Sequence, residues 1–592
     1  MDEQPNQETN NVIKPDTSEP DVVEGTAANN VPSENIVEPL NRNDGAQTQP
    51  IQPVDQSTPV LQQPEVETTS QPPLTNVSNG PSKTHKSFMI VWILLLVVAV
   101  GATAYITYQR RHVSKPKVVA VKKDIPVINY AISSSDVPQY PLTYPYTNND
   151  IFIVEQMFEG LVGYKDQTKV VPLLATDWSN PNDTTWVFNL RQGVKFNDGR
   201  TMTANDVKYS LDYAVAHQND DQGGDAWIEA STISDVKVTG TNQVTITTTS
   251  PDPVLLNRLA YLGIIDSKAK LGSYTAGTGP YIVKTGTTPT TSLLDLVANN
   301  NYWGGHVYTR EVKIKSYTDT DKQAADASSG KLDLSGSYSS SQLSKIKKYT
   351  PIKIDDQGLS YIALNVQNSS SPVSSLAYRQ AMSYAIDNTK VLKAQGYVGQ
   401  QASQIVPVFL PGHNPQIANS TYDPIKAKAL LATVKNASQL VNFYYGGGNT
   451  NAAASEIAKE LNSVGFNIKP TSNNDDSTFF TDAFGGKYDM FMASDTSATV
   501  DGLDILNDLL QNEQFYLNPK IDTLIQSAGS SLNASGRITD MQQVATIVNT
   551  DKPIIPLYTI SRVYALQNSS YVVKPDLPGL DSSVYFWKIY QQ

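Results

Sequence analysis

The sequence contains no cysteine and only five histidines in 592 residues. Without cysteine there are no disulfides, thiolate zinc sites, cysteine nucleophiles or lipoprotein-type acylation site. This absence is typical of an exported protein without disulfides, but it does not demonstrate export. No two histidines lie three or four residues apart; they are His85, His112, His217, His306 and His413. We therefore expect no protein–metal site and no cofactor, although a metal chelated by a small molecule stays open as a ligand.

Aromatic residues are absent from the first 86 positions, which hold 12 of the 35 prolines. This segment carries 13 acidic residues against four basic ones, so it supplies nine of the twelve net negative charges. It cannot bury enough apolar surface to offset its chain entropy, and we predict that it is disordered. The remaining chain is close to neutral and has no basic stripe that would favour nucleic acid as a partner.

Charged residues are also missing from a run of 21 positions, 88–108. At about 1.5 Å per residue this run spans about 31 Å, so it predicts one transmembrane helix. Basic residues next to a transmembrane helix usually lie on the cytoplasmic side, and this rule would place the C-terminal side of the helix inside the cell. The rule loses force, however, when a long domain follows the helix. We favour a cytoplasmic tail and an extracytoplasmic globular part in the cell membrane. Cleavage after Ala104 is the alternative, but so long a leader favours an uncleaved anchor.

Beyond the anchor, strand and helix patterns alternate. Apolar residues alternate over 186–190 as in a half-buried strand, and 236–249 has the pattern of a hairpin. Thr203 followed by Asp206 predicts a capping box at the start of a helix. Helical spacing continues over 377–396, which predicts one amphipathic helix. This order indicates an α/β architecture with mixed sheets.

A series of distinctive blocks runs through this part of the chain. The first block, at 159–211, is EGLVGYKDQTKVVPLLATDWSNPNDTTWVFNLRQGVKFNDGRTMTANDVKYSL. The later blocks are GTGPYIV (277–283), ANNNYWGG (298–305), SGKLDLS (329–335), AYRQAMSYAIDNTKVL (377–392), YDPIKAKALL (422–431), KYDMFMASD (487–495), NPKIDTLIQSA (518–528) and DKPIIPLYTISRVYAL (551–566). In this order the blocks resemble the family 5 extracellular solute-binding proteins, which are the oligopeptide-, dipeptide- and nickel-binding components of ABC importers.

The resemblance implies a two-lobed periplasmic-binding-protein-like α/β fold with an extra subdomain, the three-domain type of the peptide-binding members. The disordered tail and the transmembrane helix precede it. The expected parts are the tail (1–86), the transmembrane helix (87–109), a linker (110–125), lobe I in three segments (126–163, 276–358 and 554–592), the extra subdomain (164–275) and lobe III (359–553).

Four ligand-binding candidates follow from the resemblance. The loop that carries Asn149 and Asp150 corresponds to a loop that lines the cleft in peptide-binding relatives. Capping of the next helix is the equally good alternative for these two residues. Tyr302 and Trp303 resemble a Tyr-Trp pair near the family's cleft, although buried Tyr and Trp more often belong to a core.

A departure from the family pattern supplies two further candidates. Peptide-binding relatives follow the strand that corresponds to 488–493 with a Trp and with an Asp that pairs with the peptide's α-ammonium. This sequence has no Trp there, and Ala498 falls at the acidic position. Asp495 and Asp501 lie on either side and could replace the missing carboxylate.

The resemblance implies a monomeric membrane-tethered protein that captures short peptides or peptide-like solutes for the permease of an ABC importer. Its two lobes would close on the ligand by hinge motion. Three alternatives stay open: a receptor of the same fold that senses its ligand, a binder of an oligosaccharide or metal chelate, and a membrane-anchored hydrolase. The hydrolase is disfavoured because no nucleophile–base pair or metal cluster is evident, so we expect no catalytic residues.

Overall fold

The computed structural model describes residues 121–592, apart from short gaps. The gaps are 133–152, 166–168, 218–229, 271–272, 287–289, 291, 337, 356–357, 447–449, 498, 512 and 574–583. The predicted tail and the predicted transmembrane helix at 88–108 therefore lie outside the described residues. Within the described ranges, no helix has both the length and the apolar character needed to cross a bilayer.

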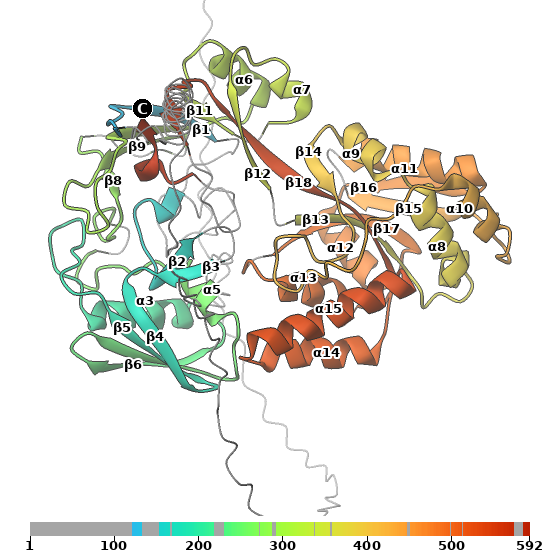
Figure 1. Cartoon of the computed structure of the whole chain (residues 1–592), viewed down its shortest axis with the longest axis horizontal. Helices are drawn as coiled ribbons and strands as arrows, with labels where there is room; N and C mark the ends of the chain where they lie inside the picture. The colour runs from blue at the N-terminus through green and yellow to red at the C-terminus, as the bar shows by residue number, and fades with distance from the viewer. Residues whose placement is uncertain are drawn as a thin grey trace, which may run out of the picture. The chain divides into compact units, whose positions relative to one another are not determined.

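A mixed sheet of twelve strands runs through the described chain, and this confirms the expected α/β class. Ten of its strands follow the order β16-β15-β17-β13-β18-β11-β1-β10-β9-β8, and β12 and β14 also pair with β18 (Figure 1). Their bounds are β1 Ile128–Ile132, β8 Tyr281–Val283, β9 Leu293–Ala298, β10 Glu311–Ser316, β11 Leu334–Ser335, β12 Thr350–Asp355, β13 Gly358–Leu364, β14 Val398–Gln401, β15 Val441–Gly446, β16 Ile468–Asn473, β17 Met490–Thr496 and β18 Ile554–Leu566.

Strand β18 joins the two halves of this sheet because it is 13 residues long. Its first part pairs with β13, where Ile554 lies opposite Ala363. Its last part pairs with β11, where Leu566 lies opposite Leu334. The predicted boundary between lobe III and lobe I at residue 554 therefore falls at the start of a strand that serves both halves, and it stays a prediction.

A smaller layer, the region predicted as the extra subdomain, precedes β8. Its four-stranded sheet has the order β4-β5-β7-β6 and packs against helix α3, while β2 and β3 pair as a separate hairpin. The alternating burial of β5 and the hairpin of β6 with β7 confirm the strand predictions. The bounds are β2 Val162–Lys165, β3 Lys169–Pro172, β4 Ala175–Asn182, β5 Thr185–Leu190, α3 Ala204–Ala216, β6 Ile233–Gly240, β7 Gln243–Thr248 and α5 Leu255–Leu259.

Helix α3 begins where the sequence predicts it. The Thr203 amide and hydroxyl both donate to Asp206 Oδ2, at 2.8 Å each, and this satisfies donors at the helix start. Asp206 is fully buried beside the guanidinium of Arg200, which also pairs with Asp266. Because Arg200 and its capping partners favour the ionised form more than burial disfavours it, the pKa of Asp206 is lowered to about 2.

Helices cover both faces of the sheet from β13 onwards (Figure 1). One face packs against α8, α10 and α11 in a single apolar cluster, and the other packs against α12, α13, α14 and α15. The bounds are α6 Thr320–Ser328, α7 Ser340–Leu343, α8 Leu376–Ala385, α9 Asn388–Gln395, α10 Pro424–Leu431, α11 Asn451–Val464, α12 Asp476–Phe484, α13 Gly502–Leu510, α14 Pro519–Ser530 and α15 Ala534–Asp551.

The prediction of one helix over 377–396 is wrong. The chain leaves the helical conformation at Ile386, and Asp387 then caps a second helix through the amides of Thr389 and Lys390. Asp favours caps over helix interiors because its carboxylate binds free amides at a helix start. The structure therefore has α8 and α9 in place of one long helix.

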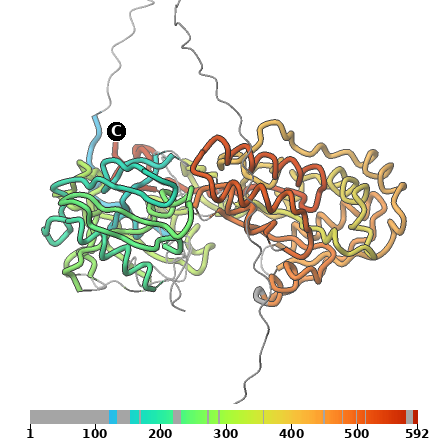
Figure 2. Tube along the Cα trace, turned by 90° about the horizontal axis from the view of Figure 1, so that it is seen from below, coloured from blue at the N-terminus to red at the C-terminus, as the bar shows by residue number. Residues whose placement is uncertain are grey.

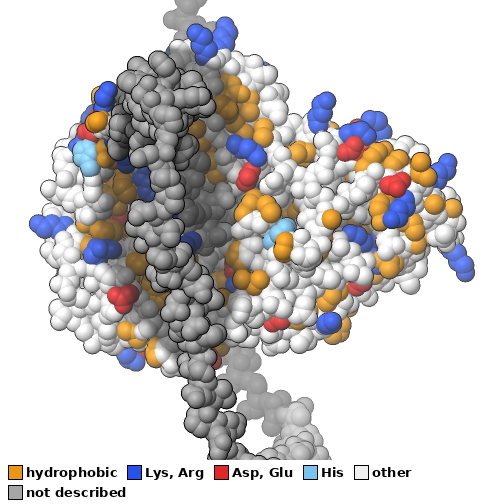
Figure 3. All heavy atoms as spheres, in the orientation of Figure 1, with side chains coloured by type: hydrophobic (Ala, Val, Ile, Leu, Met, Phe, Trp, Pro, Cys, Tyr) orange, Lys and Arg blue, Asp and Glu red, His pale blue; other side chains and the backbone are white. Residues whose placement is uncertain are grey.

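The end of the described chain returns to its beginning. Lys123 forms an antiparallel bridge with Gln591, which lies in β20 (Tyr590–Gln591), and β20 pairs with β19 (Tyr571–Val572). In Figure 2 the first described residues (blue) and the C-terminal end therefore lie near each other. On the face drawn in Figure 3, basic and acidic side chains are interspersed, in keeping with a nearly neutral folded part.

Candidate functional site

Tyr302 and Trp303 converge on one buried carboxylate, that of Glu159. Tyr302 Oη donates to Glu159 Oε1 at 2.6 Å, and Trp303 Nε1 donates to Oε2 at 2.7 Å. The Thr278 hydroxyl donates to the same Oε2 at 2.7 Å. Burial raises the pKa of Glu159 to about 7, although all three donors act against that rise. These bonds stabilise the junction of three chain segments, so a contact of Tyr302 or Trp303 with a ligand stays a prediction.

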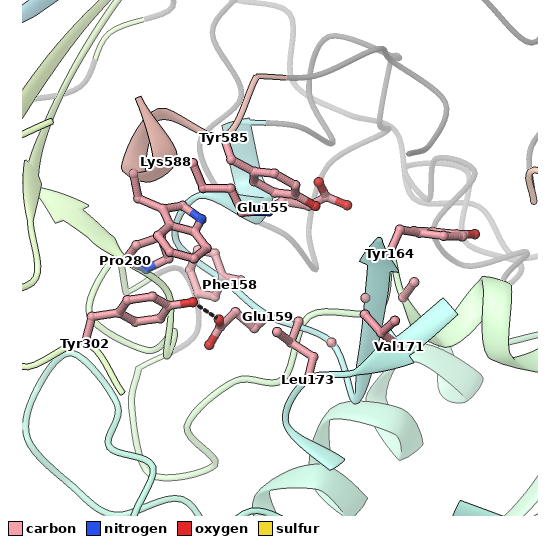
Figure 4. A pocket seen from close by; sticks show the side chains of 14 residues that line it. Glu155, Phe158, Glu159, Tyr164, Val171, Leu173, Pro280, Tyr302, Tyr585 and Lys588 are labelled. Atoms are coloured by element: carbon pink, nitrogen blue, oxygen red, sulfur yellow. Dashed lines mark hydrogen bonds between the residues drawn. The ribbon is translucent and has the colours of Figure 1, made fainter. Parts of the chain in front are cut away.

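A small cavity of about 90 Å³ lies against this junction (Figure 4). Its lining includes Glu155, Tyr164, Tyr585 and Lys588, which come from distant parts of the chain. In Figure 4, Glu155 lies next to the ring of Tyr585, and Tyr302 points to Glu159 from the opposite side. The cavity has room for a few water molecules but not for a peptide.

Asp501 lies in an internal ion pair. Arg537 Nη1 donates to Asp501 Oδ2 at 2.8 Å, and Nη2 donates to Oδ1 at 3.0 Å. The two residues are only 3% and 6% exposed. Asp501 Oδ1 also accepts the amide of Leu503 and so caps helix α13. With both oxygens engaged inside the protein, Asp501 is poorly placed to pair with a ligand's ammonium group as well.

The loop between β17 and α13 is held by a second carboxylate, Asp504. Its Oδ2 accepts the Thr499 amide at 2.7 Å, the Thr499 hydroxyl at 2.8 Å and the Ser497 hydroxyl at 2.9 Å. Val500 in this loop has φ of 58°, a conformation that a β-branched residue rarely adopts. Asp504 therefore holds Ser497 and Thr499 close to the start of helix α13.

This loop also contacts the region predicted as the extra subdomain. The Thr499 carbonyl accepts a hydrogen bond from Asn257 Nδ2 at 2.7 Å and one from Tyr164 Oη at 3.4 Å. Asn257 lies in α5 and Tyr164 in β2, so the contact joins residues 242 and 335 positions apart in the sequence. A two-body protein that opens and closes would break and re-form such polar contacts.

Asp495 lies at the end of β17 in an open pocket of about 720 Å³, which we call the acidic pocket. The pocket lies between the sheet and helices α12 and α13, and its lining includes Tyr361, Phe480, Phe484, Asp495, Asp508 and Glu513. Asp495 Oδ1 accepts the Thr496 amide at 2.8 Å, whereas Oδ2 is enclosed without a hydrogen-bond partner among the described residues. Burial and the charge of Asp508 raise the pKa of Asp495 to about 7.

The remaining sequence candidates, Asn149 and Asp150, lie outside the described residues, as does Ala498. In the described ranges, no group of three or more His, Cys, Asp or Glu side chains is arranged to hold a metal ion. Sequence reasoning missed the carboxylates Glu159, Asp504, Asp508 and Glu513. No sequence motif marks these residues. The donors to Glu159 lie 119 to 144 positions away, whereas Asp504 binds residues five and seven positions before it.

Comparison with known protein sequences gives matches to one family profile and to individual proteins. The profile described as "Bacterial extracellular solute-binding proteins, family 5 Middle" matches residues 169–516. The chain is 25% identical over 480 residues to the probable D,D-dipeptide-binding periplasmic protein DdpA of Escherichia coli (strain K12), a match that covers 74% of this chain and 89% of that protein. It is 28% identical over 306 residues to the nickel-binding periplasmic protein of the same strain, a match that covers 48% of this chain and 57% of that protein.

Solved structures share the fold. HbpA2 from Haemophilus parasuis superposes with a TM-score of 0.70 and 22% identity, covering 79% of this chain and 100% of that one. NikA from Brucella suis, solved with Fe(III)-EDTA, superposes with a TM-score of 0.67 and 21% identity over the same shares of the two chains. At these identities the likeness concerns the arrangement of strands and helices and leaves the ligand open.

Proposed function

Because this chain belongs to the family 5 bacterial extracellular solute-binding proteins, we propose that it captures a short peptide or peptide-like solute for an ABC importer. The observation that carries the proposal is the family match over 169–516, which includes most of the region predicted as the extra subdomain and most of the second half of the sheet. DdpA, whose name refers to a D,D-dipeptide, aligns over most of both chains and supports a peptide-type solute. This function requires binding and closure but no covalent chemistry.

Closure is proposed to occur around the strands that join the two halves of the sheet. Strand β18 runs through both halves, so it can act as a fixed connection while the loop at 497–501 moves against α5 and β2. The hydrogen bonds that Asn257 and Tyr164 donate to the Thr499 carbonyl support this idea, since they are few and polar. Differential stabilisation of the closed form by the solute would then drive closure.

Among the sequence candidates, we assign the carboxylate that meets a positive group of the solute to Asp495. Its enclosed Oδ2 has no partner in the described part of the protein, whereas both oxygens of Asp501 are engaged by Arg537. Asn149 and Asp150 stay candidates for polar contacts with the solute. Tyr302 and Trp303 are candidates too, although Glu159 already engages their polar atoms.

The proposal includes the setting of the protein. The globular part would work outside the cytoplasm as a monomer, tethered by the single helix predicted at 88–108, with the tail inside the cell. The permease subunits of the importer would be its protein partners. The uncharged span and the extracellular description of the family support this arrangement.

Calorimetry on the purified full-length chain tests the solute class. Separate titrations would use a mixed tripeptide and tetrapeptide library, nickel–histidine chelate, heme and a trisaccharide. Binding of peptides alone supports the proposal. Binding of the chelate, heme or sugar without peptides would replace the solute class while leaving the family function in place. Uptake of the bound solute by cells, lost when the gene is deleted, separates transport from sensing.

A further inference from the structure

A third cavity, which we call the amide pocket, lies where strand β14 runs along β18 (Figure 1). Its volume is about 230 Å³. The lining comes from β14, from the segment 402–419 and from Thr559 of β18. The amide pocket shares no lining residue with the acidic pocket or with the cavity beside Glu159. It is therefore a separate place on the protein, and the proposed capture of a solute makes no use of it.

The hydroxyl group of Thr559 is the feature that calls for a ligand. Thr559 is only 3% exposed, and it lines the amide pocket. Its Oγ1 atom is enclosed and has no hydrogen-bond partner among the described residues. A buried hydroxyl without a partner costs free energy, because it has lost its hydrogen bonds to bulk water. A molecule in the pocket could supply the missing hydrogen bond.

Gln400 lies next to this hydroxyl. It is the direct partner of Thr559 in the antiparallel ladder between β14 and β18. Residues that oppose each other in such a ladder share one face of the sheet, with Cβ atoms about 4.5–5.5 Å apart. Ser403 and Asn419 add a hydroxyl and a second amide to the lining. Amides and hydroxyls both donate and accept hydrogen bonds, so this lining matches a ligand whose polar groups also do both.

His413 and Gln404 give the amide pocket a rigid and uncharged wall. His413 Nδ1 donates to the Val406 carbonyl at 2.9 Å, and its Nε2 accepts from Gln404 Nε2 at 3.3 Å. Gln404 Nε2 also donates to the Asn414 carbonyl at 2.7 Å, while Gln404 Oε1 accepts the Asn414 amide at 3.0 Å. With one nitrogen donating and the other accepting, the His413 ring is neutral. These bonds form this wall without a ligand, which lowers the entropy cost of binding.

The lining also limits the chemical class of the ligand. It contains no Asp, Glu, Lys or Arg, so a charged group would lose its hydration here without meeting an opposite charge. A wholly apolar ligand would leave the Thr559 hydroxyl without a partner. Val406, Pro407 and Val408 provide an apolar surface for C–H groups. Pockets of about 300–1,000 Å³ hold drug-sized ligands, so this smaller pocket suits a molecule with a single ring.

We propose that the amide pocket binds one neutral sugar ring, either a free monosaccharide or the end unit of a glycan. Hydroxyl groups of the ring form hydrogen bonds with Thr559 Oγ1 and with the amides of Gln400 and Asn419. The C–H groups of the ring lie against Val408, which is 57% exposed. This binding activity does not depend on the proposed capture of a peptide, since the two use different residues.

Saturation-transfer NMR tests the ligand class on the full-length chain, in a detergent whose headgroup is not a sugar. The probes are glucose, galactose and N-acetylglucosamine, and their charged counterparts glucuronate, galacturonate and glucosamine. We expect at least one neutral sugar to bind with a Kd of about 1 mM or below, and its charged counterpart to bind at least about tenfold more weakly. The linear trimer of the bound sugar separates the two sources. An equal Kd for the trimer identifies a glycan end, and failure of the trimer identifies a free monosaccharide.

Thr559→Val shows whether the amide pocket is the site, because it removes the hydroxyl and keeps nearly the same shape. The variant should bind the sugar about tenfold more weakly, as expected for the loss of one hydrogen bond. Its melting temperature should not fall, because the hydroxyl has no described partner in the empty pocket. The matched control Thr523→Val changes an exposed residue of α14 and should keep the sugar affinity. If Thr559→Val does not fold, Gln400→Met takes its place in the binding measurement.

The remaining outcomes decide against the amide pocket or separate it from peptide capture. Absence of binding at about 10 mM of every neutral sugar, or equal binding of neutral and charged sugars, would overturn the inference. Unchanged sugar affinity in the pocket variant would overturn it too. A peptide that displaces the sugar would place the sugar in the solute site, which also refutes the amide pocket. If sugar and peptide bind without displacing each other, both proposals are supported, and if the sugar binds while no peptide does, only peptide capture fails.

Discussion

Replacing Arg537 with methionine should lower the free energy of unfolding by about 3–5 kcal/mol, the range for removing one partner of a buried ion pair. The structure supports the upper part of this range because both terminal guanidinium nitrogens, Nη1 and Nη2, donate to Asp501, at 2.8 and 3.0 Å. Both side chains are at least 92% enclosed, so water cannot replace the lost partner. Arg537 Nε also donates to the Ala528 carbonyl at 3.3 Å and ties α15 to α14.

Urea unfolding at pH 7 provides the assay. The region predicted as lobe III contains the long helices α11 and α15 but no tryptophan, so circular dichroism at 222 nm follows mainly that region. Tryptophan fluorescence follows the rest of the chain and serves as an internal control. The matched control variant is Lys345→Met, which removes an exposed ion pair with Asp321 and should cost no more than about 1 kcal/mol.

The double variant Asp501→Asn, Arg537→Met makes the test specific. It removes both charges and leaves an amide that still accepts the cap hydrogen bond, so it should be more stable than Arg537→Met alone. If Arg537→Met is as mild as Lys345→Met, the ion pair does not hold this region together. Asp501 would then remain a candidate for contact with a ligand, as it is when only the sequence is considered.

Three further outcomes are expected. Gly277→Ala should destabilise the protein by about 1–3 kcal/mol in the same urea assay, because the new Cβ would lie 2.2 Å from the Met157 carbonyl oxygen. Unchanged stability would show that the backbone relaxes freely. Asp495→Asn should raise the melting temperature at pH 8 but not at pH 4. The pKa of Asp495 is about 7 in the folded protein and about 4 in the unfolded chain, so the wild type loses stability as the pH rises from 4 to 7. An equal change of melting temperature at both pH values would contradict this reasoning. Protease added to intact, wall-free cells should digest the chain beyond about Val118 and spare a tag at Met1, and the reverse pattern would overturn the proposed topology.

The family, the α/β class and several elements could be predicted from the sequence because their signals are local. Thr203 and Asp206 are three residues apart, so the capping box is visible in the sequence and is confirmed at 2.8 Å. The apolar alternation at 186–190 depends only on the two-residue period of a strand. Local signals also mislead: helical spacing over 377–396 hides the break at Ile386, where Asp387 caps a new helix.

The roles of the site residues could not be predicted in this way, because their partners are distant in sequence. Tyr302 is 143 positions from Glu159, and Asp501 is 36 positions from Arg537. Whether a carboxylate is free to meet a solute depends on which side chains packing brings to it, and neither composition nor periodicity carries that information.

By itself, the sequence determined the family, the mixed strand–helix order and the uncharged span at 88–108, because each of these depends on composition or on patterns among residues that are close in sequence. Only the tertiary structure shows that Asp495 and Asp501 have different surroundings. Folding brings a guanidinium from α15 to one of these carboxylates, whereas it places the other in a pocket with two further acids and no described cation. The two residues look alike in the sequence, because the free energy of a buried charge is set by what surrounds it in space.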